Sequence, residues 1–157
     1  MSSFIAQIHP VATRIAKDLR QYEQIIYLGR GPGYAIALEG ALKLKELCYI
    51  HAEGYAAGEL KHGPIALIDE KRAVVVFVNA STAEKMAANV QEVLARDGKC
   101  FVVISKSAEA MIKFPESSQL EIIEMPGNTE AEEVFYSTVI LQLLAYESAT
   151  ARGLDVD

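Results

Sequence analysis

The sequence predicts an α/β fold, a three-layer αβα sandwich in which helices cover both faces of a mainly parallel sheet. Segments with the period of a helix alternate with short runs of β-branched residues, and this alternation is typical of parallel-sheet proteins. Three of the runs are apolar almost without interruption, as strands covered on both faces are. With 157 residues and 51% hydrophobic content, the chain is long enough for one domain with a sizeable core. We therefore expect a single domain over residues 1–157.

Four strands are predicted. The three apolar runs are residues 25–28, 73–78 and 101–105. Residues 120–124 alternate more between apolar and polar side chains, which indicates a strand nearer the edge of the sheet. Right-handed crossovers between parallel strands then place helices on both faces. In such folds we expect a site beyond the carboxyl ends of the strands.

Four helices are predicted, at residues 4–21, 34–50, 83–97 and 130–152. Ser81 or Thr82 is a suitable N-cap for the third helix. Gly98 and Gly153 are suitable stops for the third and fourth helices. The fourth helix is apolar nearly all round from residue 134 to residue 146, which indicates burial on more than one side. Either a partner subunit covers this helix or it is the central helix of one core, and periodicity leaves both open.

Charge and composition exclude several classes of partner. The formal net charge is −6 and no cluster of Lys and Arg interrupts it, so a nucleic acid partner is not expected. Residues 1–10 lack a basic region followed by an apolar block, and no stretch reaches the roughly 18 uncharged apolar residues that span a bilayer. Cys48 and Cys100 lack metal-ligand or redox spacing, so we interpret them as reduced core residues. We expect a cytoplasmic protein with no membrane segment.

Glu39, Lys43 and Glu46 are the first candidates for chemistry. At about 100° per residue they lie within an arc of roughly 60° on the second helix, and apolar residues flank that arc. One interpretation is a pair of ion pairs that stabilise the helix modestly. The other is a buried stripe, on which desolvation moves pKa values towards neutrality and makes the groups proton carriers. A carboxylate of that kind can remove a proton beside a carbonyl.

His62 is the second candidate. It lies between Lys61 and Gly63, and Pro64 follows, so the sequence indicates a loop rather than the interior of a helix. Loops carry functional side chains disproportionately, and a histidine titrates near neutral pH. It could therefore move protons to and from a sugar ring oxygen, although a histidine that anchors a loop is an equally simple interpretation.

Two segments could hold an anion. Residues 29–33, Gly-Arg-Gly-Pro-Gly, follow the first strand and open the second helix, where a phosphate can bind. Their spacing differs from the dinucleotide-binding pattern, and a tight turn explains them equally well. Residues 79–82 would place hydroxyls and amides at the start of the third helix, where helix capping is the favoured interpretation. The same caution applies to Ser105 and Ser107.

No cofactor and no metal are predicted.

The segments around these candidates resemble a known family. Residues 38–46 read LEGALKLKE, residues 49–53 read YIHAE, and residues 56–64 read AAGELKHGP. Together they are similar to the isomerase part of glutamine:fructose-6-phosphate amidotransferase, and more closely to its second sugar-isomerase (SIS) domain. The similarity covers nearly the whole chain.

The resemblance implies an SIS domain and a part in making glucosamine 6-phosphate and glutamate from fructose 6-phosphate and glutamine. It implies that Glu46 moves the proton between C1 and C2, and that Lys43 assists at a sugar hydroxyl. His62 would open the sugar ring, reaching the site from the neighbouring subunit of a homodimer. Glu39 would support this machinery. The expected ligands are fructose 6-phosphate and glucosamine 6-phosphate.

The chain also departs from the family pattern. It lacks the glutaminase domain with its amino-terminal cysteine, and the first SIS copy with its Ser/Thr-rich phosphate loop. The family's carboxyl-terminal tail, whose lysine forms a Schiff base with the sugar, would follow Asp157. We therefore expect the isolated chain to supply part of a composite site and to be inactive alone. Two alternatives remain: a phosphosugar-sensing module without turnover, and a dimerisation scaffold that uses the last helix.

Overall fold

A five-stranded parallel sheet lies between two layers of helices in the computed structural model, which describes residues 2–156. The strands are β1 (Gln24–Gly29), β2 (His51–Ala56), β3 (Ala73–Val78), β4 (Lys99–Ser105) and β5 (Leu120–Met125). Their order across the sheet is β2-β1-β3-β4-β5, and every neighbouring pair is parallel.

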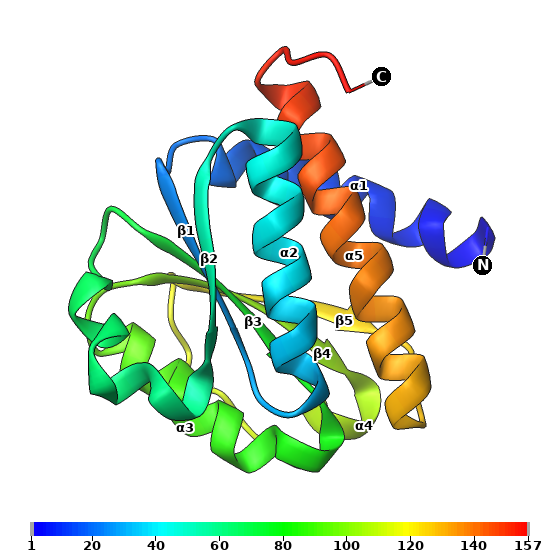
Figure 1. Cartoon of the computed structure of the whole chain (residues 1–157). Coiled ribbons are helices and arrows are strands. Elements are labelled where there is room, and N and C mark those ends of the chain that lie inside the picture. Colours follow the sequence, from blue (N-terminus) through cyan, green and yellow to red (C-terminus); the bar gives the residue numbers. More distant parts are fainter. Residues whose placement is uncertain (1, 157) are drawn as a thin grey trace.

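The helices are α1 (Ser2–Leu19), α2 (Pro32–Cys48), α3 (Ala83–Leu94), the short α4 (Lys106–Glu109) and α5 (Glu130–Ala151). Short 3-10 segments are η1 (Ala57–His62), η2 (Pro64–Leu67) and η3 (Ala80–Thr82). Helices α1, α2 and α5 cover one face of the sheet and α3 covers the other (Figure 1), with one hydrophobic core on each face. The predicted three-layer sandwich is confirmed.

All four predicted strands are present, and the structure adds a fifth. Strand β3 coincides with the predicted run because its six side chains are all buried. The edge position of β5 is also confirmed, since β5 pairs with β4 alone. Strand β2, the other edge strand, was not predicted: Ala52 is its one fully buried side chain, and it is held by main-chain pairing with β1. Gly54 lets α2 cross closely, because a Cβ there would lie 2.8 Å from the main chain of Ala37.

The predicted helices are present with shifted ends. Helix α3 ends three residues early, and Asp97 rather than Gly98 takes the left-handed conformation, with a φ of 61°. Thr82 takes the predicted N-cap position of α3, but its hydroxyl donates to the carbonyl of Asn79 and does not cap the helix. Gly153 does end α5, with a φ of 72°, as predicted.

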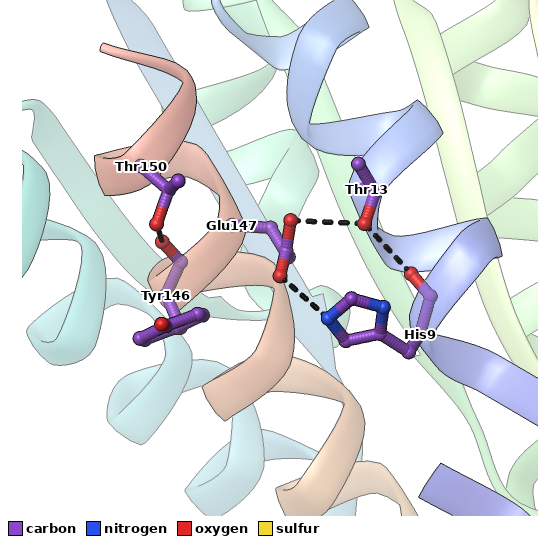
Figure 2. Close-up of polar contacts among 5 residues, drawn as sticks. All are labelled: His9, Thr13, Tyr146, Glu147 and Thr150. Atoms are coloured by element: carbon purple, nitrogen blue, oxygen red, sulfur yellow. Dashed lines mark hydrogen bonds and ion pairs between the residues drawn. The ribbon is translucent and has the colours of Figure 1, made fainter. Parts of the chain in front are cut away.

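Helix α5 is the central helix of its layer. It packs against α2 on one side and α1 on the other, which explains its apolar composition and favours the second of the two interpretations. Figure 2 shows two polar contacts between α1 and α5: the buried carboxylate of Glu147 accepts from the Thr13 hydroxyl at 2.9 Å and lies 2.9 Å from His9 Nε2. His9 thus has a place in helix packing.

None of the helices in residues 2–156 is long and apolar enough to cross a membrane.

The two cysteines are free and buried, as predicted. Burial raises the pKa of the Cys48 thiol to about 11 and that of the Cys100 thiol to about 12. At pH 8 the reactive thiolate is therefore roughly a thousandth of the Cys48 thiol and roughly a ten-thousandth of the Cys100 thiol. We expect no reaction of the native chain with a disulfide reagent over minutes at pH 8, and rapid modification of both cysteines in guanidinium chloride. Rapid labelling without denaturant would show that one of the layers opens readily.

Candidate proton-transfer cluster and its surroundings

Glu39, Lys43 and Glu46 form an ion-paired cluster on α2. The Lys43 ammonium lies 2.8 Å from a Glu46 carboxylate oxygen and 3.6 Å from one of Glu39. The exposed fractions of the three side chains are 40%, 29% and 50% in chain order. The predicted burial of this arc is therefore wrong for the single chain. The face that α2 buries against β1 and α5 is a different one, and it carries Gly40 and Leu44.

Lys43 is a fixed cation in this arrangement. Its hydrogen bond to Glu46 is the largest cause that raises its pKa above the ordinary value for lysine. The predicted shift of Lys43 towards neutrality is wrong, because desolvation is outweighed by two neighbouring carboxylates. A cation at this position can hold the Glu46 carboxylate in place and stabilise negative charge on an oxygen of a bound ligand.

The cluster borders a surface that is unusually apolar. Large apolar side chains are exposed along α2 and α5, which pack side by side (Figure 1). We call this surface the α2–α5 outer face; its residues are Tyr34, Leu38, Leu42, Tyr49, Phe135 and Tyr146. Exposed apolar side chains that gather along a pair of packed helices are typical of an interaction site. Of the apolar residues that flank the arc in the sequence, Leu42 lies at the surface, whereas Ile36 is buried in the core and Leu47 packs against it.

His62 is the last residue of η1, and its side chain is 73% exposed. Segment η1 follows β2 and packs against α3, while α2 covers the opposite face of the sheet (Figure 1). Within residues 2–156, no hydrogen bond or ion pair joins His62 to the α2 cluster. One chain therefore does not bring the four predicted site residues together.

Neither of two surface pockets, of about 540 and 570 Å³, coincides with these residues. The first is lined by residues 21–24 and 70–72, and the second by side chains from residues 109–122. In the described part of the chain, no group of three or more His, Cys, Asp or Glu side chains could hold a metal ion.

The glycine-rich segment after β1 is a tight turn. The Gly33 N–H donates to the Arg30 carbonyl at 2.9 Å, and Gly31 has a positive φ of 51°. A Cβ on Gly29 would lie 2.0 Å from the carbonyl oxygen of Gly33, so the turn needs glycine at its first position. These observations favour the structural interpretation of residues 29–33.

Glu133 is the residue that the sequence did not identify. Its carboxylate, on a residue only 2% exposed, lies beyond the carboxyl ends of β3 and β4. Its hydrogen-bond donors are the Ala80 N–H at 3.2 Å, the Asn79 amide at 3.3 Å, the Ser107 hydroxyl at 3.0 Å and the Ser105 hydroxyl. The donors that suggested a phosphate site in the sequence thus bind the chain's own carboxylate.

The amino-acid sequence also identifies the family of the chain. Residues 18–152 match the family model of the SIS domain. The chain belongs to the SIS domain family.

The SIS domain is similar to parts of longer enzymes. It is 49% identical over 144 residues to glutamine–fructose-6-phosphate aminotransferase (isomerizing) of Escherichia coli strain K12, covering 91% of this chain and 23% of that protein. It is 43% identical over 158 residues to the enzyme of the same name from Rhizobium leguminosarum bv. viciae, covering 100% of this chain and 26% of that protein. The predicted resemblance is confirmed, and the chain spans about a quarter of the length of these curated relatives.

A solved structure gives the same result. The C-terminal domain of glucosamine-fructose-6-phosphate aminotransferase from Francisella tularensis matches with a TM-score of 0.91 and 38% identity, over 99% of this chain and 43% of that one. Tagatose-6-phosphate ketose/aldose isomerase from E. coli matches with a TM-score of 0.72 at 21% identity, a likeness that concerns the fold alone.

Proposed function

We propose that this SIS domain supplies the proton-transfer residues with which glutamine–fructose-6-phosphate aminotransferase interconverts ketose and aldose hexose 6-phosphates. The observation that carries the proposal is the ion-paired cluster of Glu39, Lys43 and Glu46 at the border of the α2–α5 outer face. It occurs in a chain 49% identical to an enzyme of that name. This function would place the protein in the cytoplasm.

The chemistry requires one carbon-bound proton to move. In the open-chain sugar, Glu46 takes the proton from C1 of fructose 6-phosphate and returns it to C2, and a hydroxyl proton passes between the two oxygens as the carbonyl moves to C1. Lys43, 2.8 Å from Glu46, orients the carboxylate and donates to the sugar oxygen on which charge develops. Glu39, 3.6 Å from Lys43, holds the ammonium from its other side. His62 opens the sugar ring.

The active site would be composite. The cluster is too exposed on one chain to exclude water, and His62 lies in a different layer of the fold. A neighbouring domain on the α2–α5 outer face would cover the cluster, and a second subunit of a homodimer would bring its own His62. The phosphate of fructose 6-phosphate or glucosamine 6-phosphate would bind elsewhere in the assembly, because Glu133 occupies the donors at the carboxyl ends of β3 and β4. That occupancy also weighs against the phosphosugar-sensing alternative.

The test compares the isolated chain with a chimera in which it replaces the corresponding quarter of the E. coli relative. Conversion of glucose 6-phosphate to fructose 6-phosphate is assayed in both, and both sugar phosphates are titrated by calorimetry. We expect turnover by the chimera and none by the isolated chain. Turnover by the isolated chain would show a complete site, binding without turnover would favour a sensing module, and a folded but inactive chimera would contradict the proposal.

A further inference from the structure

A polar network links the turn after β1 to the segment that carries His62. The Arg30 guanidinium donates from Nε to the side-chain oxygen of Asn89 at 3.2 Å. The Asn89 amide donates in turn to Glu92 at 3.1 Å, and the other carboxylate oxygen of Glu92 lies 2.9 Å from the Lys61 ammonium. Lys61 directly precedes His62. The connection thus runs from the sheet through α3 to the residue before the proposed ring-opening group.

We propose that this network positions His62 for its reach into a neighbouring subunit, with Lys61 and Glu92 as the positioning residues closest to it. The inference rests on the proposed function of His62. It adds four residues, Arg30, Lys61, Asn89 and Glu92, to which neither the sequence nor the comparisons assign a role.

The two hydrogen bonds of the Asn89 amide fix how the network connects Arg30 to Glu92. This residue is 4% exposed on α3, and both ends of its amide are used, one as acceptor from Arg30 and one as donor to Glu92. A buried amide with both ends satisfied has one orientation, so it transmits the position of Arg30 to Glu92. Arg30 itself is confined by η1, since a Cβ on Gly58 would lie 3.1 Å from its guanidinium.

Segment η1 needs such an anchor. It is a 3-10 helix of six residues in which only Ala57 and Leu60 are buried, and Gly63 follows it with a φ of 149°. Short 3-10 segments with few buried side chains open easily. The two residues of η1 that follow Leu60 are therefore held mainly by their polar contacts. His62 itself lies 4.0 Å from the exposed Glu59 of the same segment, whereas the contact of Lys61 ties the segment to α3. Its partner Glu92 is largely shielded from water, with an exposed fraction of 21%.

The experiment uses Lys61→Met and Lys61→Arg, each in the isolated chain and in the chimera. Hydrogen exchange of residues 58–63 is measured in the isolated chain, and kcat and KM for isomerisation are measured in the chimera. Lys71→Met, an exposed lysine before β3, is the matched control.

We expect Lys61→Met to speed exchange in η1 and to lower kcat by roughly tenfold to a hundredfold, the usual cost of a misplaced catalytic group. Lys61→Arg should retain most of both, and Lys71→Met should change neither. A Lys61→Met chain with native exchange and native kcat would overturn the inference, as would a Lys61→Arg chain that is as impaired as Lys61→Met. Inactivity of the native chimera would count against the proposed function instead, and hydrogen exchange would still test the anchor.

Discussion

Glu46→Gln in the chimera is expected to lower the rate of sugar isomerisation by roughly 10²–10⁴-fold, the usual contribution of a positioned general base. The amide keeps the shape of the side chain and still has an oxygen 2.8 Å from the place of Lys43 Nζ, so substrate binding should change little. The loss should therefore fall on kcat. Steady-state kinetics with fructose 6-phosphate and glucose 6-phosphate measure it.

Glu84→Gln is the matched control, because it neutralises an exposed glutamate in the first turn of α3, on the other face of the sheet. Its rate should equal that of the native chimera. A normal rate with Glu46→Gln would remove Glu46 as the proton carrier. Lys43 should add no pH dependence to the isomerisation rate below the ordinary pKa of lysine. The hydrogen bond to Glu46 raises the pKa of Lys43 further, so Lys43 stays protonated throughout that range.

Sequence patterns were most informative where burial alone decides structure. The six residues of β3 are apolar and buried on both faces, and the predicted bounds are those observed. Strand β2 escaped prediction because its stability lies in main-chain pairing with β1 and in a glycine at position 54, neither of which a hydrophobic pattern reveals. The apolar runs in the sequence thus predicted four of the five strands but not the edge strand β2.

The environment of the α2 cluster was mispredicted for a physical reason. Leu38 and Leu42 are apolar, and hydrophobicity along a helix cannot distinguish a side chain that faces its own core from one that faces a partner. The residues were predicted from their spacing and from the motifs around them, and their part in a site stays a prediction. One chain packs η1, which carries His62, against α3 on the other face of the sheet, so the assembly of His62 with the cluster stays a prediction.

The hydrogen bonds of Glu133 join residues that are far apart in the sequence, and no sequence pattern shows that they meet. Its donors lie 54 residues away at Asn79 and 28 residues away at Ser105. One signal was present: Ser137 and Ile140 follow Glu133 at helical spacing and are buried, which places Glu133 on the buried face of α5. An acidic residue on such a face needs donors, and the polar ends of β3 and β4 were the available ones.

Glu133→Ala is expected to lower the free energy of unfolding by about 3 kcal/mol or more, because it leaves buried donors without an acceptor. The Ala80 N–H and the Asn79 amide lose their partner outright. The serine hydroxyls can turn to other acceptors, since Ser105 and Ser107 lie 2.9 Å apart and the Gly127 carbonyl is 3.1 Å from Ser107. A loss of this size is a large part of the roughly 5–15 kcal/mol that stabilises an ordinary domain.

Two further variants distinguish the loss of the buried Glu133 carboxylate from a general weakening of the start of α5. Glu133→Gln keeps the volume and one acceptor oxygen, so its free energy of unfolding should lie between those of the native chain and Glu133→Ala. Glu132→Ala removes the neighbouring exposed carboxylate, which caps α5 by accepting from the N–H groups of Asn128 and Thr129, and should cost only about 1 kcal/mol. Urea unfolding followed by circular dichroism orders the three variants. If Glu133→Ala were no less stable than Glu132→Ala, the donors at the ends of β3 and β4 would have to be satisfied without Glu133, and this edge of the sheet would then be free to bind an anion from solution.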